Sequence, residues 1–342
     1  MHGSMEGETV HVPSPARERF YDSRGYGHPR GDGLALSPAE AAHLLYRGDL
    51  DAVDGKGFQS FLATTDALVP FLVYKDLRER GFYLSPARDG WVGRDVAERA
   101  DFVVYPRGNG PWDGVTEYAV QVVGEREPIS LTELSGTLAV VDEESEITYF
   151  SVEQPTLAGS TAHDLPADVP GMLLADRVVL WDCPSELYER AFFGQALGDG
   201  PSDDDDPLSI QCSLVEAAYL ADAGIIRIDA GTDGIVERGR AVVGDRFDRR
   251  LAVYRELRDR QLVPKTGYKY GADFRTYDDV EHVGSLPHSN DLVRVRPSGK
   301  AMSTRDLALD VRMAHGVRKR MVFALTDAKG EIDWRSVSRL TP

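Results

Sequence analysis

The segment Val73-Tyr-Lys-Asp-Leu-Arg-Glu-Arg-Gly81 returns in the second half of this 342-residue chain as Val253-Tyr-Arg-Glu-Leu-Arg-Asp-Arg-Gln261. Five of the nine positions are identical, and three more keep their charge. Other segments recur in the same order, at offsets between 172 and 185 residues: Ser37–Ala42 with Ser213–Ala218, Asp101–Tyr105 with Asp273–Tyr277, and Asp142–Ile147 with Asp327–Ile332. Self-similarity at one long period indicates two copies of one domain.

Both copies have the same predicted order of elements. A small portion of strands and helices comes first, then the charged helix around the repeated segment, then strands mixed with one further helix. This order predicts an α/β (α+β) protein of two tandem units, each with a small N-terminal α/β subdomain and a C-terminal mixed-sheet subdomain. A stretch rich in Pro, Gly and small polar residues separates them. We therefore expect a first repeat at 1–155, a linker at 156–172 and a second repeat at 173–342, with its mixed-sheet subdomain from about residue 250.

The charge of the chain is unevenly distributed. Its 56 Asp and Glu against 39 Lys and Arg give a formal net charge of -17, which would ordinarily argue against a nucleic-acid partner. Residues 249–320, however, hold 16 Lys and Arg against 9 Asp and Glu. This basic region makes an anionic partner possible, whereas the acidic remainder suits a high-salt cytoplasm as a hypothesis. The densest acidic run lies in Pro201–Pro207, predicted to be a disordered, solvated loop.

Other features of composition narrow the class of protein. No apolar run approaches the roughly 18 residues that a membrane helix needs, and the first thirty residues lack the apolar block of a secretory signal. We expect a cytoplasmic protein with no membrane partner. The two cysteines, Cys183 and Cys212, form neither a disulfide framework nor a zinc motif, so we expect buried, unreactive thiols.

The two copies differ in residues that could carry chemistry. Tyr277 has a counterpart in Tyr105, but alignment of the surrounding strands places Val115 at the position of His288. It also places Leu134 at the position of Lys319. The second copy is therefore predicted to be catalytic, and the first to be a degenerate structural repeat.

A helix is predicted to open at Ser303-Thr-Arg-Asp306, a capping-box pattern. Its apolar stripe consists of Leu307, Val311 and Ala314. The same periodicity of 100° per residue places Arg312, His315 and Lys319 together on another face. We expect this helix to present cations away from its own core.

Tyr277, His288 and Lys319 together suit in-line cleavage of RNA, in which the 2'-hydroxyl attacks the neighbouring phosphate. One group must accept the 2' proton, a second must protonate the leaving 5' oxygen, and a cation must stabilise the negatively charged phosphorane. Free tyrosine has a pKa of about 10. A nearby ammonium such as Lys319 would lower that value and favour tyrosinate.

Each of these residues also has a simpler interpretation. Tyr277 could be a strand aromatic on a half-buried face, and a histidine in a turn or a basic run on a helix is usually a solvated surface feature. Carboxylates and imidazoles in the same region could instead bind a divalent metal: these are Asp278, Asp279, Glu281, His282 and His288. A metal nuclease would want a paired acid followed two residues later by lysine, and these strands carry no such element.

Three motifs, KTGYKYGADFRTY, PHSNDLV and VRMAHGVRKRMVFAL, resemble the catalytic domain of the archaeal tRNA-splicing endonucleases. The two unequal copies resemble the form of that family in which a structural repeat is fused ahead of a catalytic one. The resemblance implies that Tyr277 is the general base, His288 the general acid and Lys319 the stabiliser of the transition state. It also implies metal-independent excision of introns from precursor tRNA at a bulge-helix-bulge, leaving a 2',3'-cyclic phosphate and a 5'-hydroxyl, with no cofactor.

The same resemblance implies a homodimer with two active sites. An acidic loop of the structural repeat is expected to dock on the partner's catalytic repeat, and Asp142, Glu143 and Glu144 fit that role. Two arginines are expected to hold a bulged base, namely Arg312 by its motif position and Arg335 as its partner. Two other classes of function stay open: a catalytically silent RNA-binding or scaffold protein, and a metal-dependent DNA nuclease on a related core.

Overall fold

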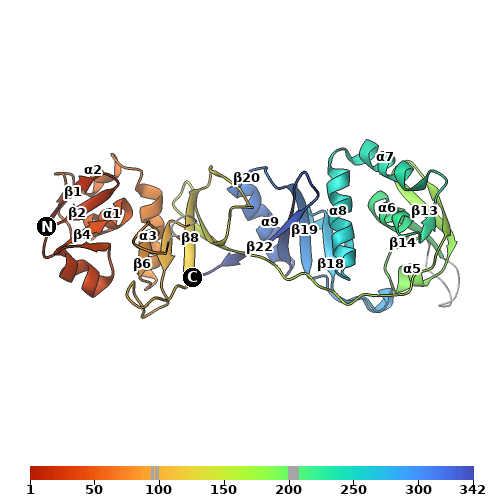
Figure 1. The fold of residues 1–342 in the computed structure, drawn as a ribbon, viewed down its shortest axis with the longest axis horizontal. Coiled ribbons are helices and arrows are strands. Elements are labelled where there is room, and N and C mark those ends of the chain that lie inside the picture. Colours follow the sequence, from red (N-terminus) through yellow and green to blue (C-terminus); the bar gives the residue numbers. More distant parts are fainter. Residues whose placement is uncertain (94–95, 97–99, 199–207) are drawn as a thin grey trace. The chain divides into compact units, whose positions relative to one another are not determined.

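The computed structural model describes residues 1–93, 96, 100–198 and 208–342, and the chain divides into two compact units (Figure 1). Unit 1 comprises Met1–Glu153 with Ala301–Ala308 and Ser338–Pro342. Unit 2 comprises Gln154–Lys300 with Leu309–Val337. The acidic run in Pro201–Pro207, predicted as a solvated loop, lies outside the described residues.

Unit 1 begins with a five-stranded sheet in the order β3-β4-β2-β1-β5, in which β1 and β5 are parallel and the other pairs antiparallel. Its strands are β1 (His2–Glu6), β2 (Thr9–Val12), β3 (His28–Arg30), β4 (Gly33–Leu36) and β5 (Ala52–Val53), with helices η1 (Arg17–Asp22), α1 (Pro38–Tyr46) and α2 (Phe58–Leu62). Helix α1 starts with a complete capping box between Ser37 and Glu40.

Helix α3 (Leu68–Glu79) carries the first repeated segment and leads into a mixed sheet of order β6-β7-β8-β10-β11. Only β8 and β10 among these neighbours are parallel. The strands are β6 (Leu84–Pro86), β7 (Phe102–Val104), β8 (Tyr118–Gly124), β10 (Gly136–Val141) and β11 (Ile147–Glu153). Residues 125–135 contain turns and β9 (Pro128–Ile129), which pairs with β20 (Met302–Ser303), in place of a connecting helix.

Unit 2 has a five-stranded sheet in the order β14-β15-β13-β12-β16, again with one parallel pair, β12 and β16. Its strands are β12 (Val169–Leu173), β13 (Arg177–Cys183), β14 (Gln195–Ala196), β15 (Leu208–Ser213) and β16 (Ile226–Arg227), with helices α5 (Glu186–Glu189), α6 (Leu214–Asp222) and α7 (Gly231–Val243). Helix α6 opens with a capping box between Ser213 and Glu216, matching the one that opens α1.

Helix α8 (Arg246–Asp259) carries the second repeated segment and leads into the order β17-β18-β19-β21-β22. The strands are β17 (Val263–Thr266), β18 (Phe274–Tyr277), β19 (Asp291–Pro297), β21 (Arg320–Thr326) and β22 (Ile332–Leu340), with the short turns η2 (Tyr268–Tyr270) and η3 (Val283–Ser285). Strands β19 and β21 are parallel, and helix α9 (Thr304–Gly316) connects them.

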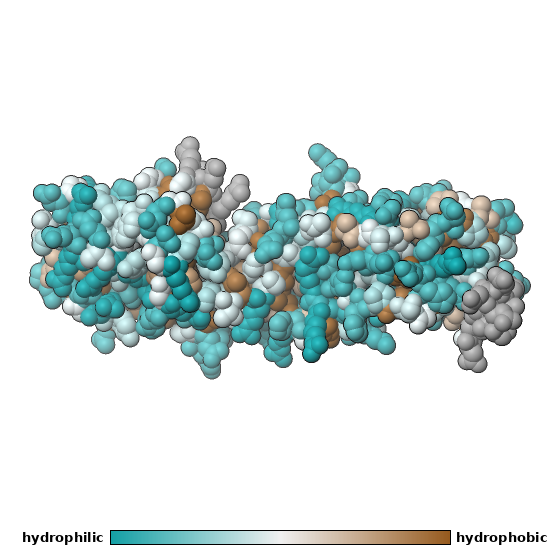
Figure 2. All heavy atoms as spheres, turned by 90° about the horizontal axis from the view of Figure 1, so that it is seen from below, coloured by the Kyte–Doolittle hydropathy of each residue, from teal (hydrophilic) through white to brown (hydrophobic). Residues whose placement is uncertain are grey.

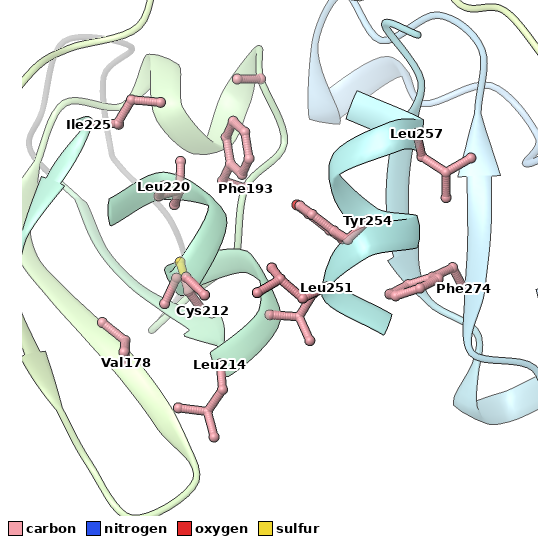
Figure 3. Close-up of a cluster of buried hydrophobic side chains, with 14 of the residues drawn as sticks. Val178, Phe193, Cys212, Leu214, Leu220, Ile225, Leu251, Tyr254, Leu257 and Phe274 are labelled. Carbon is pink, nitrogen blue, oxygen red and sulfur yellow. The ribbon is translucent and has the colours of Figure 1, made fainter. Parts of the chain in front are cut away.

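The hydrophobic core of unit 2 packs helix α8 between its first subdomain and its mixed sheet. In Figure 3, Leu251 and Tyr254 of α8 point toward the side chains of the first subdomain, while Leu257 faces Phe274 of β18. Tyr254 and Leu257 are almost fully buried, so both faces of α8 lie in apolar surroundings. Because apolar burial is the main stabilising term in folding, α8 anchors the mixed sheet β17-β18-β19-β21-β22 to the rest of the unit.

The surface agrees with the composition. In Figure 2, hydrophilic residues predominate on the face shown and hydrophobic ones are scattered among them. Within the described ranges, no helix is long and apolar enough to cross a membrane. Cys183 and Cys212 are buried free thiols, as predicted, and burial raises the pKa of Cys183 to about 11.

The predicted fold class is confirmed: the protein is a mixed α/β structure of sheets and helices. The stripe Leu307, Val311 and Ala314 is buried, and the Ser303 hydroxyl accepts the Asp306 N–H at 3.0 Å, so the helix begins where the sequence predicts.

Candidate active site

Three strands of unit 2 bring their ends together at one edge of the mixed sheet. Strand β18 runs antiparallel to β19, with Thr276 opposite Asp291, while β21 runs parallel to β19, with Arg320 beside Asp291. The carboxyl end of β18 and the amino ends of β19 and β21 therefore meet. The Arg320 guanidinium forms a paired hydrogen bond with the buried Asp291 carboxylate, at 2.8 and 2.9 Å, which fixes this row.

Asn290 lies at the centre of this edge. Its backbone N–H donates to Thr276 O at 3.0 Å, and its carbonyl accepts the Arg320 N–H at 3.0 Å. Tyr277 directly follows Thr276 on β18, and Lys319 directly precedes Arg320, the first residue of β21. Neighbouring strands of a sheet lie about 4.8 Å apart. His288 precedes Asn290 by two residues. The backbone thus gathers all three predicted catalytic residues at one edge of one sheet.

Tyr277 is only 6% exposed, and its ring makes an edge contact with Phe192, with centroids 5.8 Å apart. The Arg275 guanidinium lies 5.6 Å from the ring centroid. Burial raises the pKa of Tyr277, Tyr270 adds to this, and Arg275 opposes it without reversing the direction. The expectation that a neighbouring ammonium lowers this pKa is therefore wrong for the free protein, because desolvation of the phenolate dominates.

Helix α9 ends at Gly316 in a Schellman motif. The Lys319 N–H donates to Ala314 O at 2.9 Å, and the Arg318 N–H donates to His315 O at 3.0 Å. Arg318 has φ 56, the left-handed position that glycine usually occupies. Because the chain turns here, Lys319 lies after the helix, and the prediction that it shares a helical face with Arg312 and His315 is wrong.

The turn aims Lys319 back at the sheet edge. Its Nζ donates to the carbonyl of Ser289 at 2.6 Å, in the residue next to His288. The same ammonium lies 5.9 Å from the ring centroid of Tyr270, in η2. Lys319 is partly buried, so its charge is less screened than that of a free surface lysine.

His288 is exposed, in the loop between η3 and β19. The other histidine of that loop has a structural environment: His282 Nδ1 accepts the Gly284 N–H at 2.9 Å, and its Nε2 lies 3.8 Å from Glu189 in α5. Since both ring nitrogens of His282 face protein groups, its geometry favours His288 as the histidine able to meet a substrate.

The carboxylates near the edge make partners within the protein. Asp278 accepts a hydrogen bond from the Asn290 side-chain amide, and burial raises the pKa of Asp278. In the part of the chain that the structure describes, no three His, Cys, Asp or Glu side chains gather as a metal site would require. The alternative ligand set of the 278–288 loop is thus not brought together.

The two arginines predicted to hold a base come from different elements of unit 2. Arg312 is exposed on α9. Arg335 lies on β22 opposite Phe323, where it pairs with Asp333 and its Nη1 donates to Trp334 O at 3.1 Å. Arg335 is therefore held within its own strand, whereas the guanidinium of Arg312 is accessible.

The acidic segment 142–144 forms the turn between β10 and β11 of unit 1. The Asp142 Oδ1 accepts the N–H groups of Glu144 and Glu146, each at 2.9 Å, while Glu143 pairs with Arg126 at 2.7 Å. Glu143 and Glu144 are exposed. Asp142 thus holds the shape of the turn, while the carboxylates of Glu143 and Glu144 face solvent.

Sequence reasoning missed three residues of the edge. Tyr270 reaches Lys319 and raises the pKa of Tyr277, Asn290 joins the three strands, and Arg318 sets the turn before Lys319. A signal existed for Tyr270, which is flanked by Gly267 and Gly271, the latter at φ 66. Glycine in such a position marks a tight turn that places a neighbouring side chain.

Comparison with known families gives two matches along the chain. The model of the tRNA intron endonuclease catalytic C-terminal domain matches residues 247–334. The model of the tRNA intron endonuclease N-terminal domain matches two segments, residues 1–63 and 169–238. The catalytic match contains β18, β19, α9 and β21, and hence the whole sheet edge described above.

Curated relatives match over their full lengths. The tRNA-splicing endonuclease of Haloferax volcanii is 57% identical, and that of Haloarcula marismortui is 56% identical, each with all of both chains covered. The tRNA-splicing endonuclease of Methanosarcina mazei is 34% identical with 98% of both chains covered. This chain therefore belongs to the tRNA-splicing endonuclease family.

Proposed function

We propose that this enzyme excises introns from precursor tRNA by cutting both splice sites of a bulge-helix-bulge. The reaction is a metal-independent transesterification that leaves a 2',3'-cyclic phosphate and a 5'-hydroxyl. The names of the relatives support the substrate class. The observation that carries the chemistry is the convergence of Tyr277, His288 and Lys319 at one sheet edge.

Each residue has one role in this mechanism. Tyr277 accepts the proton of the attacking 2'-hydroxyl, and His288 protonates the departing 5' oxygen. Lys319, whose ammonium already lies against the Ser289 carbonyl, stabilises the negative charge that develops on the phosphorane. Because burial raises the pKa of Tyr277, its phenolate is scarce in the free protein, and the bound substrate must complete its activation.

The two units take unequal parts in this proposal. The chain consists of two tandem copies, with the degenerate repeat at 1–155, a linker at 156–172 and the catalytic repeat at 173–342. The double match of the N-terminal domain model and the equal strand orders of the two units support this arrangement. Two chains associate into a homodimer with two active sites, one for each splice site, and Asp142, Glu143 and Glu144 contact the partner.

RNA recognition in this proposal combines charge with stacking. The basic residues of 249–320 bind phosphates, while Arg312 and Arg335 hold a bulged base. Arg312 is better placed for this role, because Arg335 would first have to leave Asp333. Substituting each arginine separately tests this pairing. If only the Arg312 variant loses RNA binding, another residue is its partner.

The test is cleavage of a bulge-helix-bulge RNA in excess chelator by the parent protein, His288→Ala and Lys319→Ala. The control is His315→Ala, which removes an exposed imidazole on α9 that has no role in the proposed chemistry. The proposal expects cyclic-phosphate ends without metal, a loss of roughly 100-fold or more in rate for each of the two variants, and activity retained in the control. Cutting that requires metal would favour a metal-dependent nuclease, and binding without cutting would favour a silent RNA-binding protein.

A further inference from the structure

Residues 157–163, hereafter the strap, have no regular secondary structure, yet they are fixed along unit 2. Leu157 is 6% exposed and belongs to the unit's hydrophobic core. The Gly159 N–H donates to Arg260 O at 2.9 Å, and the Thr161 N–H donates to Gln261 O at 3.1 Å. The strap is therefore hydrogen-bonded to the residues that follow α8. A segment that served only as a linker would need no such bonds.

The other side of the strap holds the residues that follow Tyr277. The Ser160 N–H donates to Asp278 O at 2.8 Å. The Thr161 hydroxyl oxygen accepts the Val280 N–H at 2.9 Å, and His163 Nε2 lies 3.2 Å from Val280 O. Three contacts thus fix residues 278–280, directly after the candidate base.

The approach of strap and loop is too close for a side chain at Gly159. A Cβ there would lie 2.3 Å from Gln261 O and 2.7 Å from Asp278 O, both backbone atoms that have no freedom to move aside. Glycine at this position allows the strap to run between the end of α8 and the start of the active-site loop.

The held residues connect directly to the chemistry. Val280 is 1% exposed and packs in one cluster with Tyr277, Phe192 and Val263. From Val280 the loop runs through η3 to His288, and its remaining side-chain anchors include His282 beside Glu189. An error in the position of Val280 would thus be transmitted both to the Tyr277 ring and to the loop that carries His288.

We propose that the strap is a positioning element of the active site, with Thr161 as its key side chain; this rests on the proposed RNA cleavage. The Thr161 hydroxyl fixes the Val280 N–H, and through it the distance between Tyr277 and the loop of His288. A displacement of about 1 Å at reacting groups lowers rates by up to roughly 100-fold. The strap thereby gives part of the segment predicted as a linker, 156–172, a role in catalysis.

The test uses the full chain with Thr161→Val, which keeps the shape and removes the acceptor. Thr161→Ser restores the hydroxyl, and Ser160→Ala is the matched control, because only the backbone of Ser160 is bonded. We expect Thr161→Val to lower kcat by about tenfold with KM within about twofold and Tm lowered by about 2–4 °C. Thr161→Ser and Ser160→Ala should behave as the parent protein.

Hydrogen exchange of peptides covering 278–290 provides a readout independent of activity. Faster exchange in Thr161→Val than in Ser160→Ala, together with the loss in kcat, supports the proposal. Unchanged exchange, an unchanged kcat or a loss confined to Tm overturns it. If the parent protein does not cut RNA at all, the proposed function fails, and faster exchange in Thr161→Val would still show that the strap holds the loop.

Discussion

Units 1 and 2 have the same strand order in both of their sheets but different side chains at one edge. Phe102 pairs with Val120 as Phe274 pairs with Val293, and the parallel pair that follows keeps the same register. By this register Tyr105 corresponds to Tyr277, and Val115 and Leu134 correspond to His288 and Lys319. The two mixed sheets therefore share one register but differ at the positions that we propose to carry the chemistry.

The connections differ as well as the side chains. Unit 2 crosses from β19 to β21 through α9, whose last turn delivers Lys319, whereas unit 1 makes the same parallel connection through residues 125–135. Leu134, at the matching place, is 3% exposed and packs as a core residue. Without this helix, the connection that the structure describes at residues 125–135 of unit 1 has no turn that presents a lysine at the sheet edge.

The turn between the last two strands has the same shape in both units but a different charge. Asp327 accepts the N–H groups of Lys329 and Glu331, each at 2.8 Å, as Asp142 does in unit 1. The exposed pair Glu143 and Glu144 is replaced by Ala328 and Lys329. A turn of the same geometry therefore carries opposite charge in the two units.

The largest expected effect is on stability and concerns Glu216 of unit 2, which is buried like its counterpart Glu40 in unit 1. Burial favours the neutral form of Glu216, but the Lys265 ammonium at 3.0 Å and backbone hydrogen bonds hold its pKa below the ordinary value. Lys265→Met would leave a buried carboxylate unpaired and lower the free energy of unfolding by about 3–5 kcal/mol. Urea unfolding measures this. Ser85→Ala, at the corresponding position of unit 1, is the control, and an equal loss in both would contradict the comparison.

Glu40, the counterpart of Glu216, has no such lysine, and burial raises its pKa to about 7 from 4.5. A carboxyl whose folded pKa is raised stabilises the fold below its unfolded pKa, and this stabilisation is lost as pH rises toward 7. We expect a loss of about 3 kcal/mol across that window, which Glu40→Gln should abolish. Unfolding at several pH values tests this: a parent-like slope in Glu40→Gln would contradict it, and Glu216→Gln should change the slope in the opposite direction.

The acidic turn gives a smaller effect, on assembly. Glu143→Gln with Glu144→Gln should weaken the proposed dimer by about tenfold, or roughly 1.4 kcal/mol, at low salt. Asp142 is left intact, because its carboxylate holds the turn. Light scattering over a dilution series measures the dimer, and the control is Lys329→Gln in the matching turn. A double variant as dimeric as the parent at every dilution would exclude the turn from the interface.

The smallest expected effect concerns the end of α9. Arg318 adopts a left-handed conformation, which costs a residue with a side chain about 1 kcal/mol relative to glycine. Arg318→Gly should therefore raise the free energy of unfolding by about 1 kcal/mol, whereas Arg318→Ala should not. Thermal unfolding of the two variants measures this difference. Equal stabilities would mean that the turn is not strained.

Sequence alone predicted the class of the fold, because caps, repeats and strand patterns are local. The cap at Ser303 and the stripe of α9 appear where the residues indicate. It failed for Lys319, because a helical period was extended past Gly316, and for the pKa of Tyr277, because burial depends on Phe192, 85 positions away in sequence but in contact through folding. Asn290 and the strap were missed for the same reason: backbone contacts leave no mark in residue types.

The most direct test of the account compares the two corresponding tyrosines. Tyr277→Phe and Tyr105→Phe each remove one phenolic hydroxyl from the same position of equivalent sheets, and the Tyr105 hydroxyl donates to Ser85 at 2.9 Å. Single-turnover cleavage of a bulge-helix-bulge RNA in chelator is the measurement. We expect a loss of roughly 100-fold or more for Tyr277→Phe and parent-like cleavage for Tyr105→Phe. Equal rates for the two variants would contradict the claim that unit 2 alone carries the chemistry.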